Sequence, residues 1–379
     1  MTAFALYRLP YEQQCTLMEQ TEESPQVLGS CVDLNGCTGF VMAPFCISTA
    51  TPLLLIRPDS VSSFPQTDVL TAAQDVTSLC EKLMAVEQNA EASHTASRAD
   101  YAIDFANFLS RLQAGEFQKM VLARSADYVL PAAGDDGADV SPLELFRRAC
   151  LAYPRLFVAL VGTPQGGLWL TATPEVLLEG DGTSWRTIAL AGTIRLEGRE
   201  LDSEGEHVLW SAKNIEEQRV VATYIAQCLT RFSADFREEG PRTVRAADLV
   251  HLRSDFVFTL QSPDGVGHLL HALHPTPAVC GLPKQQAWQF IRQHERTPRL
   301  YYSGFMGPLN FQSPSLQSLP PVGGGWGEAS HLYVSLRCMQ LFAGHGVLYA
   351  GGGLLRESTE EQEWLETEAK MNTMRQLLS

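Results

Sequence analysis

The spacing of hydrophobic and polar residues predicts strands and helices in irregular alternation along this chain. An apolar run at 52–56 predicts a short strand, and residues 157–174 predict two strands joined by a turn. One helix face is formed by Tyr101, Phe105, Phe108, Leu109 and Leu112, with Gly115 as the expected end. Further helices are expected at 69–86, 204–230 and 284–295, and surface loops at 131–141 and 313–330. Long strands without regular crossover helices favour an α+β architecture.

The C-terminal pattern predicts a strand over 332–342 with Arg337 inside it, a glycine-rich turn at 350–353, and a helix. Glu363, Glu366 and Lys370 fall on one face of that helix, beside its apolar stripe. Taken alone, this face is more often solvated, with Glu366–Lys370 an ordinary ion pair. The alternative is a pocket wall. Its carboxylates would suit a hard divalent cation, and Arg337 with the glycine N–H groups would suit a carboxylate or phosphate.

Composition narrows the class of protein. The 379 residues allow one large domain or two ordinary ones, and 45% of them are hydrophobic. We expect no membrane span and no secretory signal, because the chain lacks a long apolar run and a basic, then apolar, N-terminus. Nine scattered cysteines predict free thiols in a reducing cytoplasm. The net charge of −15 argues against nucleic acid as a partner, and an anionic substrate would need local cations.

Other segments place reactive side chains in apolar strands. Lys119 shares a strand face with apolar residues, and it could be an edge-strand lysine or a buried functional amine. Glu175 stands between two apolar strand halves, although Glu is seldom buried without a partner. A strand is expected to end at 191–193, where Gly192 would let a ligand approach the backbone. A helix carries Asn214 and Glu217 on one side, more often a solvated face.

Several segments, in one order, resemble the chorismate-utilising enzymes, and isochorismate synthases among them. They are FQKMVLAR, TPEVLL, ALAGT, SAKNIEEQRVV, VHLRSDF, HPTPAVCG, RTPRLYYSG, AGGGLL and the C-terminal helix, within residues 100–379. The resemblance implies one large α+β chorismate-binding domain with a β-sheet core wrapped by helices. It would cover 96–379, with residues 1–95 completing the fold. It also implies chorismate as the substrate and a monomer or weak dimer.

The resemblance assigns roles residue by residue. Lys119 matches the family's general base and Glu175 its general acid. Glu217 and Glu366 match ligands of Mg²⁺, with Glu363 acting through water. Substrate contacts are implied for Gly192, Thr193, His251, Ala278, Tyr302, Arg337, Gly351, Gly353 and Lys370. The chain departs from the family pattern at Asn214, which is usually acidic, at Gln218, which is often His, and at Gly352, which is commonly Ala.

The activity implied is isochorismate synthase, in which water adds at carbon 2 of chorismate while the carbon 4 hydroxyl leaves. Water is a poor nucleophile and hydroxide a poor leaving group, so both a base and an acid are needed. Anthranilate synthase component I usually has Gln at the position that matches Lys119 of this chain, so the lysine favours addition of water. Salicylate synthase, which then eliminates pyruvate, tends to have Thr at Ala278, so this sequence leans toward stopping at isochorismate. Menaquinone synthesis is the expected pathway, and siderophore synthesis stays open.

Overall fold

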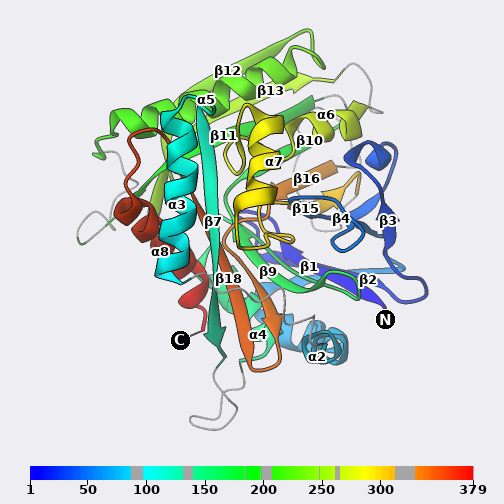
Figure 1. Ribbon diagram of the computed structural model, residues 1–379. Coiled ribbons are helices and arrows are strands. Elements are labelled where there is room, and N and C mark those ends of the chain that lie inside the picture. Colours follow the sequence, from blue (N-terminus) through cyan, green and yellow to red (C-terminus); the bar gives the residue numbers. More distant parts are fainter. Residues whose placement is uncertain are drawn as a thin grey trace.

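Strands dominate the computed structural model, which describes residues 1–86, 97–130, 140–182, 184–196, 198, 207–246, 248–260, 265–311 and 329–378 (Figure 1). They form two nine-stranded sheets, and every described strand pairing is antiparallel. The first sheet has the order β14 (Gly281–Leu282), β7 (Lys119–Val129), β18 (His345–Leu354), β17 (Cys338–Phe342), β9 (Gly167–Thr173), β8 (Phe157–Thr163), β1 (Ala3–Arg8), β2 (Gln14–Gln20) and β6 (Ser60–Pro65).

The second sheet has the order β12 (Phe236–Ala246), β13 (Leu249–Thr259), β11 (Ser184–Arg195), β10 (Val176–Asp181), β16 (Ala329–Val334), β15 (Phe305–Leu309), β4 (Gly39–Ala43), β5 (Leu53–Ile56) and β3 (Gln26–Leu28). The first six strands of the chain are divided between the two sheets, since β1 pairs with β8 and β4 with β15. The domain boundary expected between residues 95 and 96 falls at the edge of a stretch outside the described residues, and it stays a prediction.

Helices cover the outer faces of the sheets. They are α1 (Val69–Ala72), α2 (Thr77–Ala85), α3 (Arg98–Gln113), α4 (Pro142–Ala152), α5 (Ala212–Leu229), α6 (Val266–Leu273), α7 (Lys284–His294) and α8 (Glu360–Arg375). Figure 1 shows α3 and α8 side by side against β7 and β18. α5 packs on β11 and β13 of the second sheet. No described helix has the length and hydropathy needed to cross a bilayer.

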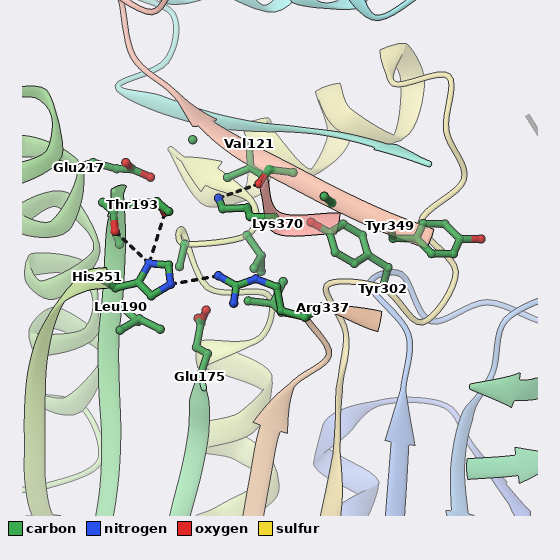
Figure 2. A pocket seen from close by; sticks show the side chains of 18 residues that line it. Val121, Glu175, Leu190, Thr193, Glu217, His251, Tyr302, Arg337, Tyr349 and Lys370 are labelled. Carbon is green, nitrogen blue, oxygen red and sulfur yellow. Dashed lines mark hydrogen bonds between the residues drawn. The ribbon is translucent and has the colours of Figure 1, made fainter. Parts of the chain in front are cut away.

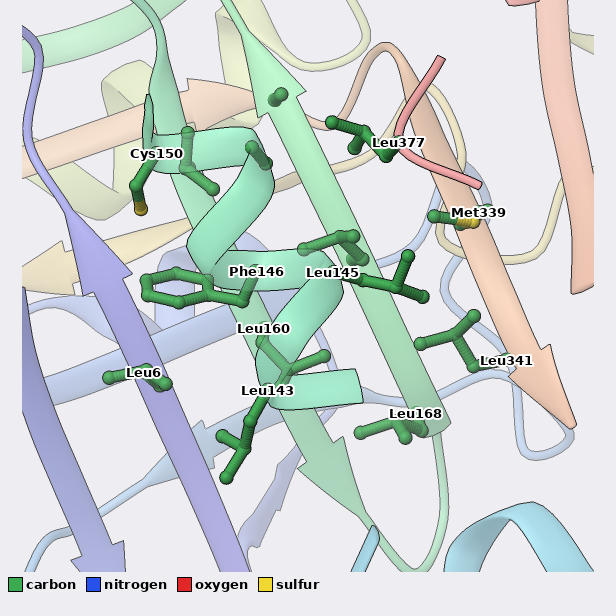
Figure 3. Packing of buried hydrophobic residues seen from close by; sticks show 14 of the residues in the cluster. Leu6, Leu143, Leu145, Phe146, Cys150, Leu160, Leu168, Met339, Leu341 and Leu377 are labelled. Carbon is green, nitrogen blue, oxygen red and sulfur yellow. The ribbon is translucent and has the colours of Figure 1, made fainter. Parts of the chain in front are cut away.

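Apolar layers hold these elements together. Between the sheets, Phe157 of the first stacks on Tyr333 of the second with ring centroids 4.3 Å apart. On the outer face of the first sheet, α4 buries Leu143 and Phe146 against the strands (Figure 3). Burying each such side chain stabilises the fold by roughly 1.5–3 kcal/mol. α4 begins where Ser141 accepts a hydrogen bond from the Glu144 N–H and Pro142 occupies the first turn.

The structure confirms the α+β class and several predicted elements. β5, the strand pair β8 and β9, and helices α3 and α7 lie where the pattern places them. Gly115 follows α3 at φ 78°, as a helix-ending glycine does. The single helix expected at 69–86 is wrong, because a 3₁₀ turn at Gln74–Val76 separates α1 from α2. The helix expected from 204 begins only at Ala212, capped by Ser211, and 204–206 lie outside the described residues. So do most residues of the two expected surface loops.

Three predictions about the backbone near the site were wrong. Arg337 is not inside a strand, because the chain leaves the second sheet after Val334 and joins the first at Cys338. The glycine-rich segment is not a turn but part of β18, paired with β7. The tight turn is instead at Gly344 (φ 76°), where β17 and β18 form a hairpin. β11 does not end at Gly192 but continues through a bulge there.

Candidate active site

A pocket opens among segments that are far apart in sequence (Figure 2). Most of the predicted site residues line it: Glu175, Gly192, Thr193, Glu217, His251, Ala278, Tyr302, Arg337, Gly351, Gly353 and Lys370. The others, Lys119, Glu363 and Glu366, do not line it, and all three lie beside the glycine segment of β18. Figure 2 shows Glu175 entering from one side and Glu217 from the other, with His251 and Arg337 between them.

Glu175 is a buried acid at a strand junction. It lies between β9 and β10, where the chain crosses from the first sheet to the second. Its side chain is 3% exposed. Burial disfavours the charged carboxylate and raises the pKa of Glu175 to about 7, although Lys119 and Arg337 oppose the shift. A carboxyl group with this pKa can hold a proton near neutral pH and give it up.

Arg337 projects into the pocket from a strained position, with φ 46° in a non-glycine residue. Its Nη2 donates to His251 Nε2 over 3.0 Å. A guanidinium can only donate, so His251 Nε2 is the acceptor and Nδ1 carries the hydrogen, which it donates to the Gly192 carbonyl at 3.0 Å. Burial and then Arg337 lower the pKa of His251 well below its usual value. A neutral His251 therefore fixes Arg337. Arg337 forms no ion pair with Glu363 in the described structure, where Glu363 pairs with Lys213.

The glycine segment presents backbone groups to the pocket. The N–H groups of Val121 and Ala123 on β7 point away from β18, to Cys280 O and Glu295 Oε2. Their β18 partners Gly353 and Gly351 are therefore in non-hydrogen-bonded pairs, with their own amide groups facing away from β7. Both glycines line the pocket. The Gly351 carbonyl accepts from Lys370 Nζ at 2.9 Å.

Lys119 is completely buried in β7, between β14 and β18. The edge-strand interpretation is therefore wrong, and the buried amine is what the structure shows. Lys119 Nζ lies 3.0 Å from Glu217 Oε1. Burial opposes ionisation of Glu217, but Lys119, Lys213 and Lys370 outweigh it and lower the Glu217 pKa. A Cβ on Gly353 would lie 2.0 Å from Glu217 Oε1, so only glycine leaves room for this pair.

Three carboxylates surround the glycine segment, and each pairs with a lysine. Glu217 pairs with Lys119, Glu366 with Lys370 at 2.6 Å, and the fully buried Glu363 with Lys213. Burial and the neighbouring Glu366 raise the pKa of Glu363 to about 7. Among the described residues, no three His, Cys, Asp or Glu side chains converge closely enough to hold a metal ion. The three expected metal ligands therefore all lie beside β18, but they do not form a metal-binding cluster in this structure.

The donor set nevertheless fits a hard cation. Glu363 Oε2 is buried and has no hydrogen-bond partner among the described residues. It lies 3.0 Å, and Glu366 Oε1 3.9 Å, from where a Cβ on Gly352 would be, so both carboxylates face this bare stretch of backbone. Carboxylate oxygens are the ligands that Mg²⁺ prefers.

Sequence reasoning missed several residues that shape the site. Arg299 donates to the carbonyls of Val279 and Val121, and it pairs with the buried Glu295. This pair ties two pocket-lining segments together beside Tyr302, whose ring stacks on Tyr349. No periodicity in the sequence indicates these long-range contacts.

Lys213 and Ser358, which both contact Glu363, were also missed. Lys213 precedes Glu217 by one helical turn, so their shared helix face was the available signal.

The model of the chorismate binding enzyme family matches residues 53–379. The chain is 32% identical over 287 residues to the salicylate biosynthesis isochorismate synthase of Pseudomonas aeruginosa, covering 74% of this chain and 55% of that protein. It is 29% identical over 330 residues to the isochorismate synthase EntC of Escherichia coli K12, covering 85% and 77%. The chain thus spans about half the length of the first of these relatives and three quarters of the second.

Solved structures share the fold. A putative 2,3-dihydroxybenzoate-specific isochorismate synthase, DhbC, from Bacillus anthracis matches with a TM-score of 0.77 at 20% identity, over 100% of this chain and 96% of that one. The menaquinone-specific isochorismate synthase MenF from Escherichia coli gives 0.72 at 22% identity, over 100% and 89%. The family model covers most of the chain and every residue that lines the pocket, and this protein belongs to the chorismate binding enzyme family.

Proposed function

We propose that this protein is an isochorismate synthase. It would interconvert chorismate and isochorismate by adding water at carbon 2 of the ring and releasing the hydroxyl from carbon 4. Family membership and the named relatives support the substrate. The observation that carries the proposal is the placement of the buried acid Glu175 and the Glu217 carboxylate on different sides of one pocket (Figure 2), with the buried amine of Lys119 3.0 Å from Glu217.

Glu175 is the proposed general acid. A pKa of about 7, raised by burial, keeps much of this carboxyl protonated near neutral pH. It can therefore donate to the departing hydroxyl, which is a poor leaving group without a proton.

Lys119 is the proposed general base. The residue is fully buried 3.0 Å from Glu217, with which it forms an ion pair, and it can take a proton from water only in its neutral form. The pocket also contains Ala191, which offers no nucleophile, so attack by water is favoured over covalent catalysis.

We assign the dianionic substrate to the cations and amides of the pocket. Arg337 presents a guanidinium held by His251, and it suits a two-pronged contact with a carboxylate. Lys370 and the amide groups of Gly351 and Gly353 lie along the same pocket. In a chain of net charge −15, these few groups would supply the local attraction.

Glu217 and Glu366 are proposed to hold Mg²⁺, with Glu363 close by. When bound, Mg²⁺ would fix the ring carboxylate of the substrate and withdraw electron density from the ring double bonds. The unpartnered Glu363 Oε2 and the bare backbone at Gly352 support this assignment. The site has one negative charge fewer than is usual in the resembled family, because Asn214 stands where that family usually has an acidic residue.

We propose menaquinone synthesis as the pathway served, as in the name of the menaquinone-specific enzyme MenF, with siderophore synthesis as the alternative. Ala278 lines the pocket, in keeping with an enzyme that stops at isochorismate. The test is a product assay with chorismate and Mg²⁺, analysed by chromatography and a pyruvate measurement. Isochorismate without pyruvate is expected. Stoichiometric pyruvate with salicylate would reassign the chain as a salicylate synthase, and full activity in excess chelator would reject the metal.

A further inference from the structure

Glu363 is held through only one of its two carboxylate oxygens. Its Oε1 accepts hydrogen bonds from Ser358 Oγ, at 2.7 Å, and from Lys213 Nζ. Its Oε2, although buried, has no partner among the described residues and faces Gly352. The side chain is thus fixed from one side and presents a free oxygen on the other.

The Ser358 hydroxyl is oriented by its own turn. Its oxygen accepts from the Leu355 N–H at 3.1 Å, and the residue is 5% exposed. A hydroxyl has one hydrogen to donate, and here Glu363 receives it. Ser358 therefore constrains the rotation of the Glu363 carboxylate without adding charge.

Lys213 supplies the charge that the buried carboxylate needs. It lies in the first turn of α5, on the same helix face as Glu217 and one turn before it. Its contact with Glu363 joins α5 to α8. A fully buried carboxylate without a counter-charge is costly, so this pair also maintains the fold around the site. Lys119 and Lys370 have roles in the proposed reaction, whereas Lys213 has none there.

We propose that Lys213 and Ser358 are positioning residues that hold Glu363 by Oε1 so that Oε2 is presented to a divalent cation. This inference rests on the proposed magnesium-dependent function. They touch neither the substrate nor the cation. Residues that orient metal ligands from outside typically contribute about 10- to 100-fold to metal affinity. The same range is expected for each of these two residues.

The test measures Mn²⁺ affinity of the full-length, substrate-free protein by electron paramagnetic resonance. Ser358→Ala and Lys213→Met should each bind Mn²⁺ about 10- to 100-fold more weakly than the wild type. Lys213→Arg keeps the cation and should recover most of the affinity. The matched controls Ser78→Ala and Lys82→Met, on exposed positions of α2, should leave it unchanged. Loss of the signal in Glu366→Gln identifies the site being measured.

The outcomes separate this inference from the proposed function. Unchanged affinity in Ser358→Ala, with normal binding in the wild type, would overturn the inference alone. Tighter binding in Lys213→Met would overturn it too, because Lys213 would then compete with the cation rather than position its ligand. No Mn²⁺ binding by the wild type would reject the metal in the proposed function and this inference with it. If Lys213→Met does not fold, Ser358→Ala still decides, since it leaves the charge pair intact.

Discussion

At the scale of single residues, burial rather than residue type decides what each candidate can do. The sequence places Glu175 between apolar segments, but only the structure shows it 3% exposed at a crossing between sheets. The same holds for Lys119. The pattern allows an edge-strand lysine or a buried amine equally, and the position of β7 between β14 and β18 decides for the buried amine. Motif resemblance named both residues. It could not supply their surroundings, because those come from strands distant in sequence.

Replacing Glu175 by Gln should lower kcat by about two to four orders of magnitude while substrate affinity changes little. In the wild type, kcat/KM should fall as pH rises through about 7, because the acid must be protonated. The stability of the fold should change with pH in the same direction. Because the pKa of Glu175 is higher in the folded than in the unfolded state, its contribution to the free energy of unfolding is fully present below the unfolded pKa and is lost as pH rises through the folded pKa. Near-normal turnover in Glu175→Gln, with the exposed Glu81→Gln as control, would exclude the role.

Lys119→Gln should likewise reduce turnover by about two to four orders of magnitude with little loss of chorismate binding. The amide cannot take a proton from water, although it can still contact Glu217. Steady-state kinetics and a binding titration check both halves of this expectation. Formation of an amino product when ammonia is added would strengthen the comparison with anthranilate synthase, while retained hydration activity would show that another group is the base.

Arg337→Ala should raise KM for chorismate about 10-fold or more, since hydrogen bonds to charged groups are typically worth about 1.5–3 kcal/mol. The ligand-free Tm should change little, because the buried Arg337 forms no ion pair within the described residues. Kinetics and thermal unfolding, with the exposed Arg57→Ala as control, measure the two effects. A lower Tm at unchanged KM would make Arg337 structural.

At the scale of elements, the pattern located strands and helices better than their ends and breaks. Periodicity found α3 and α7, whose apolar faces are complete within one segment. It joined β16 and β17 into one strand, because residues on both sides of Arg337 are apolar and only tertiary structure assigns them to different sheets. It also read Gly351–Gly353 as a turn. These residues lack side chains because lysine, tyrosine and carboxylate groups occupy the space beside a strand.

Because the glycine segment is a strand, alanine substitutions at its neighbouring positions 352 and 353 should affect activity differently. Gly353→Ala would place a Cβ 2.0 Å from Glu217 Oε1 and 3.0 Å from Lys119 Cε, displacing the proposed base and metal ligand. We expect activity to fall about 100-fold, as misplacement of reacting groups can cause. Gly352→Ala would place a Cβ 3.0 Å from Glu363 Oε2 and 3.9 Å from Glu366 Oε1, which are the ends of flexible side chains, and the resembled family commonly has Ala here, so this substitution should cost much less. Equal activity in the two variants would contradict this placement of Glu217.

At the scale of the whole molecule, the site exists because the chain crosses repeatedly between two sheets. Glu175 lies at one crossing and Arg337 at another, while β11 and β13 bring Gly192 and His251 from the second sheet. The pattern and the family resemblance both predicted the α+β class, and the resemblance named Glu175, Arg337 and further residues that line the pocket. Physical reasoning from one sequence could not predict the pairing of nine strands in each sheet, because such contacts depend on residues hundreds of positions apart.

The proposed reaction adds water to one ring carbon while a hydroxyl leaves another. It is tested most directly by mass spectrometry of the product formed from chorismate and Mg²⁺ in water enriched in oxygen-18. The wild type should form isochorismate that carries one oxygen-18 atom in its ring hydroxyl, and Glu175→Gln should not form it. A control that adds the labelled water only after quenching should give no label. Isochorismate formed in labelled water without oxygen-18 would mean that the hydroxyl moves within the substrate, and it would rule out the proposed addition of water.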